Sequence, residues 1–123
     1  MPAKFTIKVM GADKVVAMLG KKKEDIQKAV TTGVNKAALF IEGEVKESIS
    51  GHRAEKRSVD TGNFLRSPTT KMLGKSEAEV YSDTQYAKHL EFGNSALAPR
   101  WHFRNTRDRN SSKVIEIIKN EVK

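Results

Sequence analysis

Apolar and polar positions alternate near the amino terminus of the chain. Phe5, Ile7 and Val9 are separated by polar residues, which is the two-residue period of a half-buried β-strand. The alternation predicts a strand over Lys4–Met10. A short helix with apolar residues on one face is predicted to follow over Lys14–Leu19, after a glycine that breaks the alternation.

The longest periodic segment lies between residues 26 and 49. Its apolar positions are three and four residues apart, so one stripe of a long α-helix collects all of them. The stripe consists of Ile26, Val30, Val34, Ala37, Ala38, Ile41, Val45 and Ile49. Gly51 is predicted to end this helix. Gly33 and Gly43 each weaken it by roughly 1 kcal/mol, unless one marks a place where another backbone packs closely.

The second half of the chain predicts shorter elements. Strands over Thr69–Leu73 and Ala78–Ser82 flank a glycine-containing turn as a hairpin. Tyr86 to Leu90 fits one helical turn, and Ser111–Val122 is predicted as a helix with one apolar face. The fold class is therefore α+β: a small, mainly antiparallel sheet packed on one long helix, plus a C-terminal helix, in a single domain over residues 1–123.

The segment between the long helix and the first hairpin strand is basic. Gly51–Ser58 contains Arg53, Lys56 and Arg57 and no apolar anchor, so it is predicted to be an exposed and mobile loop. We expect its deletion to leave a folded protein, and we interpret its cations as contacts for an acidic face of a neighbouring subunit.

Composition narrows the class of protein. The chain carries 23 lysines and arginines against 15 acidic residues, a formal charge of +8, which indicates either a polyanionic partner or a merely basic surface. It contains no cysteine, so disulfides and thiolate metal sites are excluded. The amino terminus lacks the apolar core of a signal peptide, and no apolar run has the length of a membrane span. We therefore expect a soluble protein made in the cytosol.

Asp60-Thr61-Gly62 matches the short signature of aspartic proteases, but that chemistry needs two aspartates sharing a proton and no second phrase occurs. The simpler interpretation is a turn in which Asp60 or Thr61 accepts backbone N–H groups and Gly62 supplies an unusual backbone conformation. This turn is predicted to direct Phe64 and Leu65 into an apolar site.

Two further phrases concentrate candidate interface residues. Glu91 and Phe92 lie in Tyr86–Gly93, where Glu91 is either a solvated carboxylate or the partner of an arginine in the same or a neighbouring chain. Pro99–Arg104 alternates aromatic residues with cations, a mixture favoured at protein interfaces and on single-stranded nucleic acids.

A third interpretation of Pro99–Arg104 places Trp101 and Phe103 in the core, with Arg100, His102 and Arg104 facing solvent. The basic stretch continues beyond this phrase. The candidates for contact with DNA are Arg104, Arg107, Arg109 and Lys113.

No pattern in the chain supports catalysis or a cofactor. The three histidines match no zinc spacing, and Gly74-Lys75-Ser76 lacks the upstream glycine of a phosphate-binding loop. A nuclease interpretation of His102 with Asn105 lacks a framework of metal ligands. We predict a non-enzymatic protein without metal or cofactor.

In order, Asp60–Arg66, Tyr86–Gly93, Pro99–Phe103 and the C-terminal helix resemble the neck or tail-completion proteins of long-tailed double-stranded DNA phages. The resemblance spans nearly the whole chain. It implies a structural virion protein that forms a ring, expected to be a hexamer, which completes the proximal end of the tail and joins tail to head.

The resemblance also implies the partners: other copies of the chain, the terminal ring of the tail tube or a tail terminator, a head-completion or connector protein, and packaged DNA, with no membrane. The interface candidates are Arg53, Lys56, Arg57, Asp60, Phe64, Glu91, Phe92, Arg100, Trp101 and Phe103. The alternative function is that of a small basic nucleic-acid-binding protein.

Overall fold

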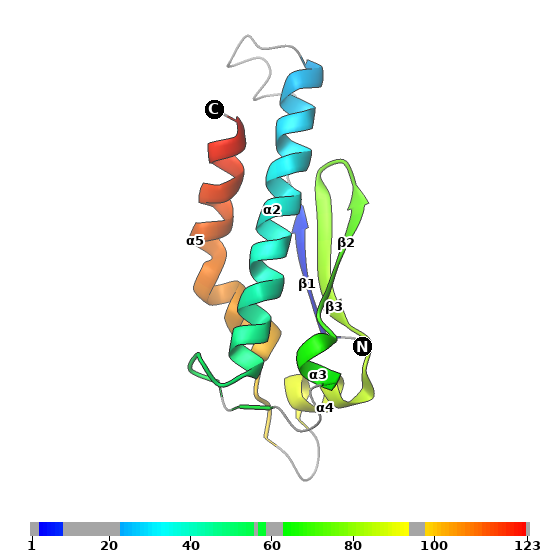
Figure 1. Cartoon of the computed structure of the whole chain (residues 1–123), viewed down its shortest axis with the longest axis vertical. Coiled ribbons are helices and arrows are strands. Elements are labelled where there is room, and N and C mark those ends of the chain that lie inside the picture. Colours follow the sequence, from blue (N-terminus) through cyan, green and yellow to red (C-terminus); the bar gives the residue numbers. More distant parts are fainter. Residues whose placement is uncertain (1–2, 9–22, 56, 59–62, 94–97, 123) are drawn as a thin grey trace.

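The structure, a computed structural model, describes residues 3–8, 23–55, 57–58, 63–93 and 98–122 (Figure 1). The predicted helix at 14–19, Lys56 and Asp60 lie outside these residues. The elements in chain order are β1 (Ala3–Lys8), α2 (Lys23–Ile49), α3 (Asn63–Arg66), β2 (Thr69–Gly74), β3 (Glu77–Ser82), α4 (Gln85–Phe92) and α5 (His102–Val122). The predicted α+β class is confirmed.

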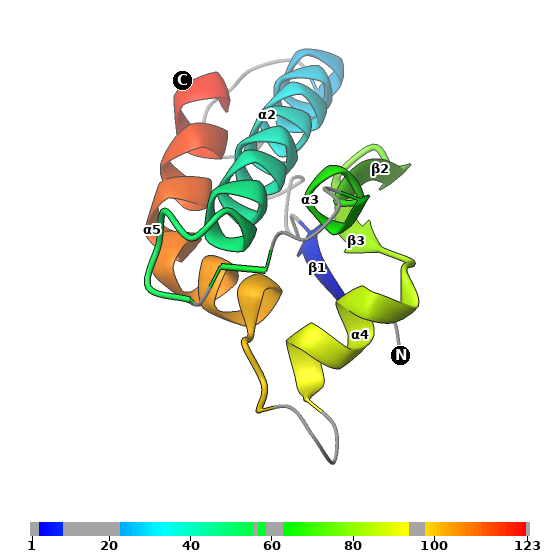
Figure 2. The same cartoon turned by 60° about the horizontal axis from the view of Figure 1, so that its bottom comes forward.

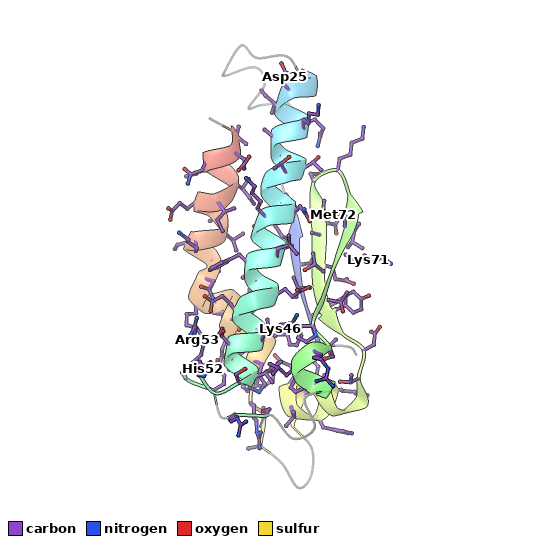
Figure 3. The ribbon with its side chains drawn as sticks, viewed as in Figure 1. Asp25, Lys46, His52, Arg53, Lys71 and Met72 are labelled. Atoms are coloured by element: carbon purple, nitrogen blue, oxygen red, sulfur yellow. The ribbon has the colours of Figure 1, made fainter. Side chains whose placement is uncertain are left out.

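The three described strands form one antiparallel sheet in the order β1-β3-β2. The predicted hairpin is confirmed as β2 and β3, and the amino-terminal strand pairs with the edge of β3 opposite β2, where Ile7 lies across from Ala78. Strand periodicity places Ala78, Val80 and Ser82 on the buried face. Lys71 of β2 lies on the other face, directed away from α2 (Figure 3).

Helix α2 lies between the sheet and α5 (Figure 1). All eight residues of the predicted stripe are buried, with exposed fractions between 0% and 2%. Each large apolar side chain buried in this way contributes about 1.5–3 kcal/mol relative to exposure. Gly51 follows the helix with a φ of 86°, a conformation that glycine adopts without the strain of a Cβ. The predicted end of the helix is therefore confirmed.

Helix α5 is longer than predicted because it begins at His102 rather than at Ser111. Its first turns carry polar and basic residues without an apolar stripe, so periodicity does not mark them as helical. They are held at the end of the fold against α4, β1 and the residues after α2. Among the described residues, no helix combines the length and the apolar character needed to cross a membrane.

The two glycines of α2 have different surroundings. A Cβ at Gly33 would lie 3.1 Å from Cα of Ile118 and 3.4 Å from Cβ of Glu121, so α2 and α5 pack closely at this glycine. A Cβ at Gly43 would meet nothing within 4 Å. Of the two roles that the sequence leaves open, Gly33 has the packing role and Gly43 is only a weak helix former.

Alanine substitution should therefore have opposite effects at these two positions. Gly43→Ala is expected to raise the free energy of unfolding by roughly 0.5–1 kcal/mol through helix propensity. Gly33→Ala is expected to lower it by about 0.5–2 kcal/mol, because the cost of pushing the added methyl against the backbone of α5 exceeds the gain in helix propensity. Urea denaturation of both variants measures the difference, and equal stabilisation of both would contradict the packing role of Gly33.

Candidate functional site

The end of α4 and the start of α5 meet at one end of the molecule (Figure 2). Thr84 caps the start of α4 by accepting the N–H of Ala87, and Gly93 ends the helix with a φ of 76°. The residues just before α5 bind the end of α4: the N–H of Arg100 donates to the carbonyl of Leu90 at 2.7 Å, and that of Trp101 to the carbonyl of Glu91 at 3.4 Å. These contacts place Trp101 directly before α5.

Glu91 caps the amino terminus of α5 from the neighbouring helix. Its Oε1 accepts the N–H of Phe103 at 2.8 Å, and its Oε2 accepts that of Arg104 at 2.9 Å. The carbonyl of Trp101 receives the first intrahelical bond, from Asn105. Phe103 and Arg104 are therefore the second and third helical residues, whose N–H groups lack intrahelical partners and normally bond to a capping side chain. A carboxylate there also favours the positive end of the helix dipole.

The structure corrects both sequence interpretations of Glu91. The residue is only 3% exposed, so it is not a solvated carboxylate, and its oxygens accept backbone N–H groups rather than an arginine side chain. Burial raises the pKa of Glu91 above its ordinary value, although the two N–H donors favour the charged form. Its role is to fix where α5 begins and where Trp101 lies.

A groove of about 410 Å³ lies beside this cap. Phe92 and Trp101 meet edge to face with their ring centroids 5.8 Å apart, and the guanidinium of Arg104 lies 4.1 Å from the centroid of the Trp101 ring. Lys4 and Arg107 also line the groove. Phe92 is 42% exposed. The groove thus presents two aromatic rings to solvent among cations.

Trp101 has a φ of 52°, and it is the one non-glycine residue with a positive φ in the part of the chain that the structure describes. This conformation costs a side-chain-bearing residue roughly 1–2 kcal/mol. The contacts to α4 and the cap of α5 hold it in place. Such strain is typical of residues whose position matters for function.

A buried polar network lies on the other side of the start of α5. His102 is fully buried: its Nδ1 is 2.8 Å from Oγ of Ser48, and its Nε2 is 2.7 Å from Oγ of Ser58. Ser48 donates its single proton to the carboxylate of Glu55 at 2.5 Å. Ser48 therefore accepts from the Nδ1–H of a neutral His102, and Nε2 accepts from Ser58.

The network continues to two arginines, one at each end. Arg100 donates through Nη1 to Oγ of Ser58 at 2.7 Å and to the carbonyl of Arg57 at 3.0 Å. Arg109 binds Glu55 with two parallel N–H···O bonds of 3.0 Å, and Asn105 adds a third donor to Glu55. Both arginines thus use their guanidinium groups within the fold.

The structure corrects the prediction of an unanchored loop. His52, Arg53 and Ala54 are exposed as expected, and Arg53 contacts Glu44 beside the end of α2 (Figure 3). Glu55 and Ser58, in contrast, are 8% and 4% exposed and bind α2 and α5. The anchors are polar, so a search for apolar residues misses them. Deleting residues 52–57 would remove Glu55 and leave Arg109 without its partner.

The electrostatics of the network favour a neutral histidine and a charged glutamate. Burial lowers the pKa of His102 to about 4, because the imidazolium form loses its hydration. Burial alone would raise the pKa of Glu55, but the hydrogen bonds from Arg109, Ser48 and Asn105 outweigh it and lower that pKa to about 2.

The structure tests the core interpretation of the proline-aromatic phrase and agrees with it only in part. Phe103 is 1% exposed in the core, as one interpretation predicts, but His102 is buried as well and Trp101 is only half-buried. Phe64 is buried, as predicted from the turn before it, and its ring contacts His102 at 5.9 Å between centroids.

Only part of the predicted interface comes together. Glu91, Phe92, Trp101 and Phe103 meet at the groove, whereas Arg53 and Arg57 lie in the loop after α2. The arginines of the basic stretch lie on different faces of α5: Arg104 and Arg107 line the groove, and Arg109 binds Glu55. Lys113 is exposed farther along α5, next to Glu116.

Sequence reasoning did not identify Lys4, Ser48, Glu55 or Ser58 as parts of a site. No local pattern marks them, because their partners are distant in the chain: Glu55 and Arg109, for example, are 54 residues apart. The burial of a glutamate within a basic loop can be recognised only when the fold places α5 beside that loop.

Comparison with protein families identifies the family of the chain. The family model described as "Bacteriophage HK97-gp10, putative tail-component" matches residues 13–93 of the chain. The chain belongs to this HK97-gp10-like family. The resemblance inferred from the sequence is thereby confirmed over residues 13–93. These residues include α2, the β2–β3 hairpin and α4, with Glu91 and Phe92.

The family match ends before Trp101 and α5. The groove is therefore built from the matched part of the chain, from the part that follows it and from Lys4, which precedes it. Searches of curated proteins and of solved structures found no significant match to the chain.

Loss of the second acceptor of Glu91 should weaken the start of α5. Glu91→Gln keeps the size of the side chain but turns an amide N–H₂ group toward one of the two backbone N–H donors. We expect a loss of about 1–3 kcal/mol in the free energy of unfolding, because a buried donor is left unpaired. Thermal or urea denaturation measures it, and the exposed Glu47→Gln is the matched control. Equal stability of Glu91→Gln and the wild type would refute the capping role.

The folded protein should lose stability as the pH falls below about 6.5. Unfolded chains bind a proton at His102 near that pH, whereas folded chains resist it until about 4. The contribution of His102 to the free energy of unfolding is full above the pKa of the unfolded chain. It falls by up to about 3 kcal/mol across this window, at roughly 1.4 kcal/mol per pKa unit.

His102→Gln does not titrate, so it isolates this effect. The difference in free energy of unfolding between wild type and variant, measured in urea at several pH values, should shrink between pH 6.5 and 4. Glu55 loses its contribution at lower pH, between its ordinary value and about 2, so the two windows are separable. A difference that is constant with pH would contradict a neutral buried His102.

Proposed function

We propose that the protein is a structural component of the phage particle that acts at the head–tail junction. In this proposal, copies of the chain form a ring that completes the proximal end of the tail and joins it to the head. Membership in a family described as a tail component supports the general assignment to the tail. The position at the junction and the ring are our inference.

The observation that carries the proposal is the exposed pair of aromatic rings beside cations at one end of the fold. Tryptophan and arginine dominate binding energy at protein interfaces, where they fill pockets on a partner. Phe92 and Trp101 are fixed by the packing of α4 on α5, so little side-chain entropy remains to be lost on binding. A rigid surface of this kind suits a protein whose task is to join other proteins.

Charge supports the same role. A chain with a net charge of +8 repels other copies of itself at long range and attracts acidic surfaces. Such a protein stays dispersed until an acidic partner gathers it. A component that completes a tail needs this property, because a ring that formed before its partner was present would be assembled in the wrong place.

The test is electron microscopy of lysates from a phage lacking this gene. We expect DNA-filled heads and separate tails side by side, and a plasmid copy of the wild-type gene should restore joined particles. Intact, infectious particles without the gene would refute a joining role. Normal heads with malformed tails would also contradict it and would place the protein earlier in tail assembly.

A further inference from the structure

We propose that the groove between α4 and α5 binds an acidic polypeptide segment that carries one large apolar side chain. This inference rests on the proposed function, because it assigns the groove as the place where the protein meets its partner in the particle. The partner is defined by chemistry: an exposed aliphatic or aromatic residue flanked by aspartates or glutamates.

The charges that line the groove select an acidic partner. Lys4, Arg104 and Arg107 are its cations. Glu91, the carboxylate among the lining residues, directs both oxygens to backbone N–H groups of α5 and so does not face a ligand. Lys4 is 3.9 Å from Glu79, and Arg107 contacts Asp108 of its own helix, but all four of these side chains remain accessible to solvent. Exposed pairs of this kind exchange readily for a carboxylate of a partner.

The aromatic residues select an apolar anchor rather than a row of bases. Single-stranded nucleic acids bind on successive rings that each offer a free face for stacking. Here the two rings meet each other edge to face, and Arg104 covers one face of Trp101. The pair thus forms one apolar corner in a groove of about 410 Å³, a size that suits a few side chains. The geometry favours a polypeptide over DNA.

Charge also argues against a second copy of this chain as the occupant. Two chains of +8 each repel, and a groove lined by three cations adds to that repulsion at short range. An acidic partner removes it. The groove therefore belongs to a contact with a different protein, and self-association in the ring would use other surfaces.

Trp101 provides the measurement, because it is the single tryptophan of the chain. The probe is a synthetic peptide without tryptophan, with one central leucine flanked by glutamates, titrated into the full-length protein while Trp101 emission is recorded. We expect saturable binding that weakens as salt rises. Replacing the leucine of the peptide by serine should weaken binding about tenfold or more, as loss of an anchor at an interface does.

Two protein variants and one control locate the site. Arg107→Glu and Phe92→Ala should each weaken binding of the peptide about tenfold. Lys28→Glu makes the same change of charge on the exposed side of α2, near the end where Asp25 lies and away from the groove (Figure 3). It should leave affinity within about twofold, because exposed charges farther apart than a Debye length are largely screened.

Three results would overturn the proposal. The first is equal binding of the leucine and serine peptides, which would indicate attraction by charge alone. The second is an equal loss of affinity in Lys28→Glu and Arg107→Glu. The third is tighter binding of oligothymidylate than of the peptide with loss in Phe92→Ala, which would assign the groove to nucleic acid.

Complementation separates failure of this inference from failure of the proposed function. A phage lacking the gene is supplied with wild type, Lys28→Glu or the double variant Phe92→Ala, Arg107→Glu. We expect wild type and Lys28→Glu to restore infectious particles and the double variant, checked for wild-type thermal stability, to lower the titre at least tenfold. If deletion blocks joining but the double variant restores it fully, the junction role stands and the groove proposal is refuted.

Discussion

The carboxylate of Glu91 is the contact on which the candidate site depends. The carboxylate accepts two N–H groups of the first turn of α5. It thereby sets the residue at which α5 starts and the direction of α5 relative to α4. The direction of α5 in turn places Trp101 over the groove and His102 beneath the loop that follows α2. One side chain on α4 thus positions both the exposed surface and the buried network.

The buried network gives the same end of the molecule its rigidity. Arg100, Ser58, His102, Ser48, Glu55 and Arg109 form a continuous series of contacts in which each donor has an acceptor. Buried polar groups are costly when they are unpaired, so a fully paired series tolerates few alternative arrangements. The loop after α2 is therefore fixed to α5 by specific contacts, although its described residues, 50–55 and 57–58, contribute no apolar side chain to the core. A fixed loop holds α5, and α5 holds the aromatic pair.

Periodic burial made the framework predictable from the sequence. Ile26 to Ile49 form a stripe that only a helix can bury on one side, and the alternation in the β2–β3 hairpin fits only a strand with one covered face. The start of α5 was not predictable in this way, because Glu91, which caps it, lies on another helix and no local capping residue precedes His102. The burial of Glu55 could not be predicted for a related reason. A charged residue is expected at the surface, and its burial depends on Arg109 arriving from a distant part of the chain.

The candidate site was predicted in composition but not in arrangement. Phe92, Trp101 and the arginines stand out in the sequence because aromatic residues and cations are typical of interfaces. The sequence does not reveal which arginines line the groove and which bind within the fold. Arg104 and Arg109 differ only in which face of α5 they occupy, and that face depends on where the helix begins. One arginine packs on Trp101 and faces the groove, while the other neutralises a buried glutamate. The same cap at Glu91 therefore decides which cations line the groove, and this links the local geometry of one helix terminus to the charge at the surface of the protein.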